Sequence, residues 1–125
     1  MYIQRLFRAS FFLGVIAICV ASLVPVEELP SIEIWDKLEH ALAYGAVAAL
    51  GAAGWAGRRR AWLMLGFGLA ALGGMLEIAQ SFVPGRMTDA GDALANVVGV
   101  VAGIVTVASV TRVAAGASRL GQTGR

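Results

Sequence analysis

The sequence predicts an all-α membrane protein with four transmembrane helices and both termini in the cytoplasm. Hydrophobic residues make up 58% of the 125 residues and charged residues only 14%, whereas a soluble domain is about half apolar and a quarter charged. The apolar residues gather in four runs of about the 17–25 residues that a helix needs to cross the hydrocarbon core. Because lipid offers the backbone no hydrogen-bond partners, these runs are expected to be helices.

The first helix is expected over residues 9–26, an unbroken apolar run preceded by Arg5 and Arg8. A cleaved signal peptide is an alternative for this run, with the two arginines as its basic region and Cys19-Val20-Ala21 as its cleavage site. Residues 25–34 contain two prolines and several acids. They are therefore expected to form a short external loop.

The second helix is expected over residues 38–57 and the third over residues 61–82, where Pro84-Gly85 gives the turn signal that ends it. The fourth helix is expected over residues 90–111. Residues 112–125 are rich in glycine, serine and arginine and are predicted to be a disordered cytoplasmic tail. The length leaves no room for a second core, so residues 1–125 are expected to form one domain. Small residues in the second and third helices favour close packing, namely Gly45, Gly51, Gly54, Gly73 and Gly74.

The charges are sorted between the two ends of these helices. Eight of the ten basic residues fall at one end, and they are Arg5, Arg8, Arg58, Arg59, Arg60, Arg112, Arg119 and Arg125. The positive-inside rule makes that end cytoplasmic. All eight acidic residues fall at the opposite end, where only Lys37 and Arg86 join them. An odd number of crossings would destroy this sorting, so four crossings are expected.

Several classes of function are disfavoured by the composition. The basic residues form no stripe with interleaved aromatic residues, so nucleic acid is not an expected partner. Cys19 is the only cysteine, which excludes an intrachain disulfide and a cysteine cluster. The chain contains no nucleophile motif, phosphate-binding loop or zinc signature. No metal is assigned, and the sequence identifies no cofactor.

Polar residues recur at helical spacing inside or beside the apolar runs. One face of the second helix carries Asp36, His40 and Tyr44, and one face of the third carries Gly73, Glu77 and Gln80. One face of the fourth carries Asp92, Asn96, Gly99 and Gly103. Asp89 is a predicted N-cap for the fourth helix, with Asp92 in the position of a capping-box partner. Because an ionisable group is costly near hydrocarbon and usually faces a protein interior, these faces predict one polar pocket at the external end.

These residues form two blocks whose order and spacing resemble the VanZ-like family, small bacterial integral membrane proteins named for one associated with teicoplanin resistance. The first block is Asp36-Lys37-x-x-His40-x-x-x-Tyr44. The second is Glu77-x-x-Gln80-x-Phe82-x-Pro84-x-Arg86-x-x-x-x-x-Asp92-x-x-x-Asn96-x-x-Gly99. The resemblance covers residues 9–111, and Ala41 stands where the family usually has an aromatic residue.

The resemblance implies a multi-pass protein of the bacterial cytoplasmic membrane that acts in the cell envelope, and it implies no settled reaction. Carried over residue by residue, it gives ligand-binding candidates at Asp36, Lys37, His40, Tyr44, Glu77, Gln80, Arg86, Asp92 and Asn96. The preferred hypothesis is a pocket for a lipid headgroup or a cell-wall precursor that contributes to glycopeptide resistance. Arg86 and Lys37 would hold its phosphate or carboxylate, and Gln80 and Asn96 would supply neutral hydrogen bonds.

Two alternatives use the same residues. In a membrane-embedded enzyme, Glu77 or Asp92 would be the general base and His40 an acid or base partner, but the sequence fixes no catalytic residue. Any divalent ion held by Asp36, His40, Glu77 or Asp92 would be Mg²⁺ or Mn²⁺ rather than a structural Zn²⁺. The second alternative is a structural assembly partner. Membrane lipids are expected partners in every case, and the sequence does not set the oligomeric state.

Overall fold

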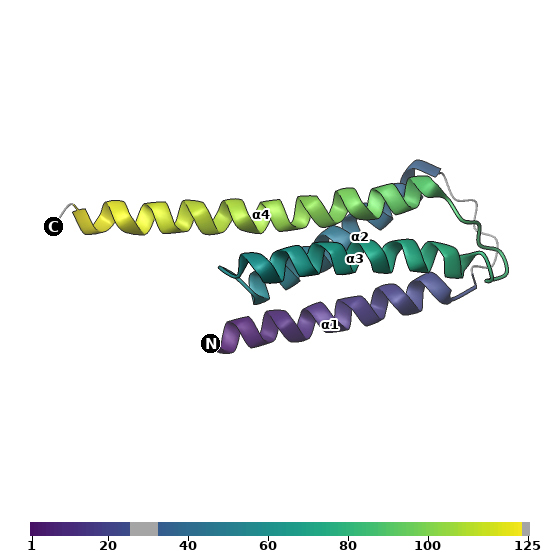
Figure 1. The fold of residues 1–125 in the computed structure, drawn as a ribbon, viewed down its shortest axis with the longest axis horizontal. Helices are drawn as coiled ribbons and strands as arrows, with labels where there is room; N and C mark the ends of the chain where they lie inside the picture. Colours follow the sequence, from purple (N-terminus) through teal and green to yellow (C-terminus); the bar gives the residue numbers. More distant parts are fainter. Residues whose placement is uncertain (26–32, 124–125) are drawn as a thin grey trace.

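The computed structural model describes residues 1–25 and 33–123, which form four α-helices. They are α1 (Tyr2–Leu23), α2 (Glu33–Gly54), α3 (Arg59–Gln80) and α4 (Ala90–Thr123). The helices lie alongside one another and alternate in direction, with the N-terminus and the α2–α3 turn at one end and the α3–α4 loop at the other (Figure 1). The predicted all-α class is therefore confirmed. Most of the loop expected at 25–34 lies outside the described residues.

Three helix bounds differ from the predicted ones by five residues or more, and the others differ by three residues or fewer. α1 begins at Tyr2, and Arg8 in its second turn donates a hydrogen bond from Nε to the carbonyl of Gly54 at 2.7 Å. α2 begins at Glu33, so Asp36 lies inside the helix, as its predicted shared face requires. α4 continues to Thr123, where the sequence predicted a disordered tail from residue 112. Alanine is the strongest helix former, and three alanines in this stretch favour the longer helix.

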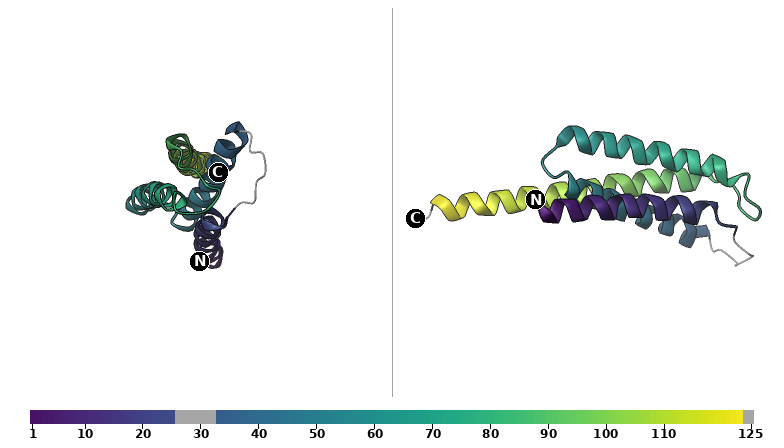
Figure 2. Two further views of the ribbon diagram at one scale, coloured as in Figure 1. Left: turned by 90° about the vertical axis from the view of Figure 1, so that its right-hand side faces the viewer. Right: turned by 90° about the horizontal axis from the view of Figure 1, so that it is seen from below.

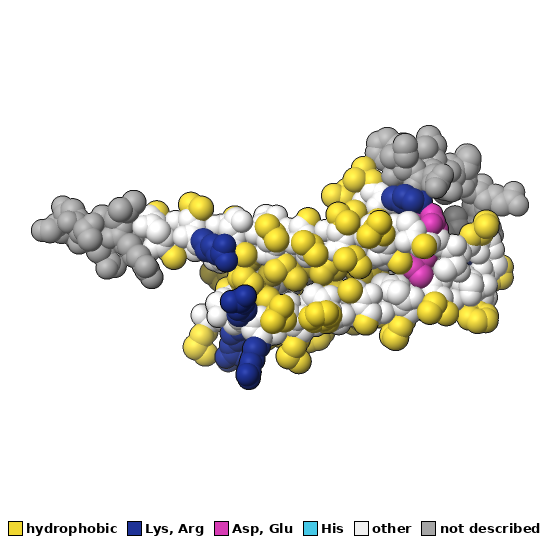
Figure 3. All heavy atoms as spheres, turned by 45° about the horizontal axis from the view of Figure 1, so that its top comes forward, with side chains coloured by type: hydrophobic (Ala, Val, Ile, Leu, Met, Phe, Trp, Pro, Cys, Tyr) yellow, Lys and Arg dark blue, Asp and Glu magenta, His cyan; other side chains and the backbone are white. Residues whose placement is uncertain are grey.

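Opposite charges mark the two ends of the molecule. We call one the basic end, because it carries Arg5, Arg8, Arg58, Arg59, Arg60 and Arg112. The other is the acidic end, which carries Asp36, Glu39, Glu77, Asp89 and Asp92 together with Lys37 and Arg86. Figure 3 shows arginine side chains gathered at one end of the visible face and acidic side chains at the other. The charge sorting seen in the sequence is thus preserved in three dimensions.

Among the described residues, three helical segments are long and apolar enough to cross a membrane, namely Tyr2–Leu23, Arg59–Gln80 and Ala90–Ser118. Their outward faces carry large exposed apolar side chains such as Phe67 and Val101. α2 falls short of the same measure because Lys37, Glu39 and His40 occupy its first turns. The composition of three helices therefore agrees with a membrane protein.

α2 holds the other helices together. It contacts α1, α3 and α4, whereas α1 and α4 do not touch in the part of the chain that the structure describes. Figure 2, seen along the helices, shows α1 and α4 well separated. The most extensive helix pair is α2 with α4. The placement of side chains between these two helices consequently depends on how closely their backbones approach.

Glycines make that approach possible. A Cβ atom added to Gly99 would overlap the carbonyl oxygen of Ala41, and one added to Gly103 would overlap the carbonyl oxygen of Gly45. A Cβ atom on Gly45 would in turn lie 3.1 Å from the carbonyl oxygen of Gly99. Backbone therefore lies directly against backbone along this contact, which we call the glycine seam, as expected for small residues at a membrane helix interface.

The other predicted packing glycines divide into two groups. Cβ atoms on Gly51 and Gly54 would meet Phe11 and Arg8 of α1, and one on Gly73 would meet Asn96 and Tyr44. Their predicted packing roles are confirmed. Gly74 was predicted wrongly, because nothing lies within 4 Å of the Cβ position. It sits one residue beyond the packed face of α3.

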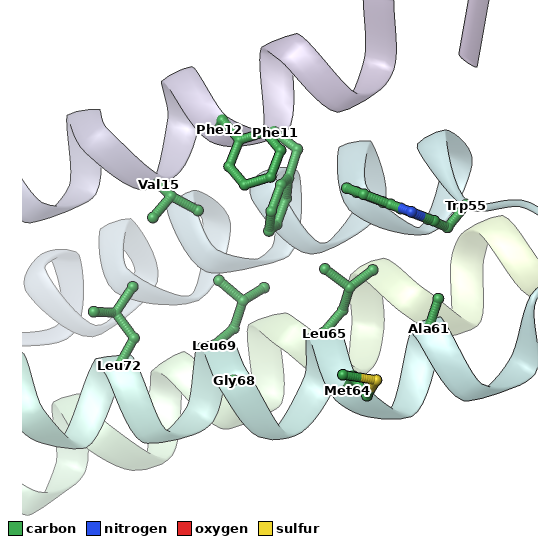
Figure 4. A pocket seen from close by; sticks show the side chains of 10 residues that line it. All are labelled: Phe11, Phe12, Val15, Trp55, Ala61, Met64, Leu65, Gly68, Leu69 and Leu72. Atoms are coloured by element: carbon green, nitrogen blue, oxygen red, sulfur yellow. The ribbon is translucent and has the colours of Figure 1, made fainter. Parts of the chain in front are cut away.

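α1 and α3 enclose an apolar crevice of about 460 Å³. Phe11 and Val15 of α1 face Leu65 and Leu69 of α3 across it, and Trp55 lies at one end (Figure 4). α1 consequently packs mainly against α2 rather than against α3. The crevice contains almost no polar surface and does not belong to the polar cluster at the acidic end.

The glycine seam predicts opposite effects for two Gly→Ala substitutions. Gly99→Ala should lower the unfolding temperature in detergent, because overpacking costs about 1–3 kcal/mol. Gly74→Ala should leave the unfolding temperature unchanged or raise it, since alanine gains up to about 1 kcal/mol over glycine within a helix and open space surrounds this position. Equal behaviour of the two variants in a thermal unfolding assay would contradict the seam.

Candidate functional site

Three helices bring buried polar side chains together at the acidic end. Glu77 and Gln80 of α3 are 4% and 3% exposed, Asp92 and Asn96 of α4 are 5% and 1%, and Tyr44 of α2 is 2%. The three polar faces that helical spacing predicts therefore do point inward. A buried polar group is costly unless it finds a partner, so the contacts of each residue define what the cluster can do.

His40 and Asn96 join α2 to α4. Nδ1 of the histidine lies 3.1 Å from Oδ1 of the asparagine. Because an amide oxygen only accepts, Nδ1 is the donor in this contact, and a neutral ring with its proton there would carry the lone pair on Nε2. Gly73 of α3 makes room for the pair, since a Cβ atom there would lie 3.1 Å from Nδ2 of Asn96 and 3.3 Å from Cε1 of Tyr44.

Lys37 links α2 to the start of α4. Its ammonium group forms a hydrogen-bonded ion pair with Asp89 and lies 3.5 Å from Oδ1 of Asp92. Asp89 also accepts the N–H of Gly91 through Oδ1 at 2.7 Å, so its predicted role as the N-cap of α4 is confirmed. The hydrogen bond from Lys37 and the one from Gly91 lower the pKa of Asp89 below its ordinary value of 3.8.

Glu77 occupies the position in the cap that was predicted for Asp92. A capping box would send the Asp92 carboxylate back to the N–H of Asp89, but that N–H lies 3.4 Å from Oε2 of Glu77. Asp92 instead lies against Lys37. The capping-box partner was therefore predicted wrongly, and the buried carboxylate of α3 connects that helix to the first turn of α4.

Arg86 reaches across the acidic end to α1. Its Nη2 atom donates to the carbonyl oxygen of Ala21 at 2.8 Å, and Nη2 and Nε each lie 3.4 Å from the carbonyl oxygen of Val24. The last carbonyls of a helix have no partner within it. Arg86 thus supplies a C-terminal cap for α1, and no feature of the sequence indicated this target.

A pocket of about 190 Å³ opens beside these residues. Five of the predicted site residues line it, and they are Asp36, His40, Tyr44, Gln80 and Arg86. The other four do not line it, and they are Lys37, Glu77, Asp92 and Asn96. Sequence reasoning missed Ser22 and Glu39, which also contribute to the wall. Ser22 is a polar residue within an apolar run, which is visible in the sequence, and the structure shows that it is buried.

In the part of the chain that the structure describes, two buried oxygen atoms have no hydrogen-bond partner, the hydroxyl of Tyr44 and Oδ1 of Asp92. Leaving such an atom unsatisfied costs about 1–3 kcal/mol. Among the described residues, Asp36, His40 and Asp92 also place one donor atom each within 4.8 Å of one another. The site therefore combines a small pocket, unsatisfied oxygen atoms and donors of the kind that bind metal ions.

A model of the VanZ/LLP1 family matches residues 3–111 of the chain. The matched region includes both sequence blocks and every candidate residue of the site. Comparison with curated proteins gave no significant match, and neither did comparison with solved structures.

The ion pair at the cap predicts a pH-dependent difference between the protein and its Asp89→Asn variant. Asparagine caps a helix about as well as aspartate, so the substitution mainly removes the charge. Because the pKa of Asp89 is lowered in the folded state, its stabilising contribution is complete above the ordinary aspartate value and disappears as the pH falls through the folded value. When thermal unfolding is measured between pH 7 and pH 3, the unfolding temperatures of the two proteins should approach each other as the pH falls. A constant difference across that range would contradict the ion pair.

Proposed function

Because the chain belongs to the VanZ/LLP1 family and is a membrane protein, we propose that its acidic end binds the polar headgroup of an anionic lipid or a lipid-linked cell-wall precursor. The observation that carries this proposal is the polar pocket between α1 and α2. Its wall combines charged and hydrogen-bonding side chains with apolar ones such as Ile18 and Ala21. A headgroup attached to hydrocarbon needs both kinds of surface.

The size of the pocket supports a small ligand group. Sites for drug-sized molecules usually measure about 300–1,000 Å³, whereas this pocket measures about 190 Å³. That volume suits a phosphate-bearing headgroup or the phosphate end of a larger precursor. The remainder of such a precursor would lie outside the pocket.

Arg86 is the residue that we assign to the anionic group. The α1 carbonyls engage its Nε and Nη2 atoms, and within the described part of the chain Nη1 makes no hydrogen bond. A guanidinium donating to phosphate forms a charge-assisted hydrogen bond. Lys37, which the sequence had paired with Arg86 in this role, lies against two carboxylates instead. Gln80 and the hydroxyl of Tyr44 supply neutral hydrogen bonds.

The positions of the two candidate general bases favour binding over catalysis. Glu77 and Asp92 are the candidate general bases, and neither lines the pocket. A general base needs to come within hydrogen-bond reach of the proton it removes. The ligand-binding hypothesis uses the residues that do line the pocket, so it accounts for more of the geometry.

We further propose that all four helices cross the bacterial cytoplasmic membrane, with both termini in the cytoplasm. The arginines at the basic end support this orientation through the positive-inside rule. α2 would then cross as the most enclosed helix, with its polar first turns at the outer face. The pocket would open toward the outer leaflet, where glycopeptide drugs meet their cell-wall target, and the protein would contribute to resistance there.

The orientation can be tested with reporter fusions in the full chain. Alkaline phosphatase joined after Thr88, in the α3–α4 loop, should be active because the enzyme folds outside the cytoplasm. The same reporter joined after Arg59, at the start of α3, should be inactive, and a cytoplasmic fluorescent reporter should give the reverse pattern. Activity after Arg59 with none after Thr88 would overturn the proposed orientation.

Lipid binding can be tested by thermal unfolding of the purified chain in neutral detergent. Phosphatidylglycerol should raise the unfolding temperature more than a diacylglycerol with the same acyl chains, since only the former carries the phosphate. Gln80→Ala and Arg86→Lys should each lower the affinity for phosphatidylglycerol about tenfold or more, and so reduce the rise in unfolding temperature. The reason is that a hydrogen bond to a charged group contributes about 1.5–3 kcal/mol.

Thr88→Ala is a matched control in the same loop, because Thr88 is exposed and does not line the pocket. It should respond to phosphatidylglycerol as the unchanged protein does. In cells, the two pocket variants should lose glycopeptide protection at normal membrane abundance. Equal stabilisation by both lipids, or an unchanged response in both pocket variants, would refute the proposed ligand.

A further inference from the structure

We propose that Asp36, His40 and Asp92 bind a divalent first-row transition metal ion, Mn²⁺ or Zn²⁺, beside the polar pocket. The three residues come from α2 and α4, on both sides of the helix contact at the acidic end. The role of this ion toward a ligand rests on the proposed function, whereas the binding of the ion itself does not.

The donor atoms are already gathered. One from each residue lies within 4.8 Å of the others, and Nε2 of His40 lies 4.0 Å from Oδ1 of Asp36 one helical turn earlier. Metal–ligand distances of about 2.0–2.2 Å place neighbouring donors roughly 3–4 Å apart. Asp36 is partly exposed near the start of α2, so rotation of its side chain would close the remaining gap.

The histidine is oriented for this role. Nδ1 of His40 faces Oδ1 of Asn96, and Nε2 lies on the side of Asp36, so a neutral ring with its proton on Nδ1 would direct its lone pair toward Asp36. Metal-bound histidines usually donate their other ring N–H to a neighbouring acceptor, which fixes the tautomer and the ring orientation. Asn96 is 1% exposed, so this contact lies in a fully enclosed position.

The charge of the cluster favours a cation. Asp92 is buried, and its Oδ1 atom makes no hydrogen bond. Lys37 lies 3.5 Å from that atom but forms its hydrogen bond with Asp89, and the buried carboxylate of Glu77 lies nearby on the same cap. Buried charges need a counter-charge, and a dication would supply it where one ammonium group is shared between carboxylates.

The donor set selects the class of metal. Imidazole suits Zn²⁺ and other later transition ions, while carboxylates also suit Mn²⁺ and Mg²⁺. The sequence suggested Mg²⁺ or Mn²⁺ rather than a structural Zn²⁺, but with one nitrogen among three donors the set favours Mn²⁺ or Zn²⁺ over Mg²⁺. Glu77, which the sequence suggested as a further ligand, lies outside the group and accepts the N–H of Asp89 instead.

The ion would have open coordination positions, because three protein ligands do not fill its shell. Asp36 and His40 both line the polar pocket, so these positions would face the volume that we assign to the headgroup. A phosphate oxygen of that headgroup would bind the ion while Arg86 donates to another. The ion would thereby define the ligand class as phosphate-bearing.

Metal binding can be measured on the full chain without an affinity tag, in detergent, after removal of metal with a chelator. Mn²⁺, Zn²⁺ or Mg²⁺ is added, excess ion is removed, and bound metal is determined by mass spectrometry. The unchanged protein should retain about one Mn²⁺ or Zn²⁺ per chain and much less Mg²⁺. His40→Gln and Asp92→Asn should lose at least tenfold in affinity. Glu39→Gln should retain the ion, because this pocket-lining carboxylate on α2 is outside the triad.

One spectroscopic measurement needs no variant. The chain contains a single histidine, so coupling between bound Mn²⁺ and an imidazole nitrogen in pulsed electron paramagnetic resonance would identify His40 even if its variants failed to fold. Retention of less than stoichiometric metal, absence of nitrogen coupling, or equal loss in Glu39→Gln would overturn the proposal.

Phosphatidylglycerol titrations with and without metal separate the two hypotheses. Metal binding without a lipid response removes the proposed function alone, and a lipid response without metal binding removes this inference alone.

Discussion

The contact between the backbones of α2 and α4 is the constraint on which the acidic end depends. Gly99 lies against the carbonyl of Ala41, and Gly103 lies against that of Gly45. His40 directly precedes the first of these contacts, and Asn96 lies one turn before Gly99 on the same face of α4. The hydrogen bond between the two side chains therefore needs the helices at this separation. A larger residue in the seam would move the donors of the site apart without touching any of them.

The polar cluster combines two kinds of residue with different tasks. Those that line the pocket, such as Gln80 and Arg86, are the residues to which we assign the ligand. Those behind it hold the helix ends together: Glu77 receives an N–H from the cap of α4, and Lys37 spans to Asp89. Hydrogen bonds between membrane helices contribute about 1 kcal/mol each. Several such contacts at one end fix the positions of the elements that carry the pocket.

The sequence predicted the features that depend on local spacing. Helical periodicity placed Glu77, Gln80, Asp92 and Asn96 on inward faces, and the N-cap at Asp89 followed from its position before an apolar run. The sequence did not predict contacts between residues that lie far apart in the chain. Nothing near Arg86 in the chain indicates that it binds carbonyls of α1, and Glu77 could not be matched to the N–H of Asp89 without the helix packing. Residues 112–123 were misjudged because composition indicated disorder while their alanines favour continuation of α4.

The cap on α1 has a consequence for the stage of synthesis at which the end of that helix gains its hydrogen-bond donors. α1 ends without a glycine, and the carbonyls of Ala21 and Val24 receive their donors from Arg86. That arginine lies 65 residues beyond Ala21, after α3. During synthesis the carbonyls at the end of α1 therefore lack this donor until the α3–α4 loop has been made. The oldest helix is capped only by the last interhelical connection to be translated.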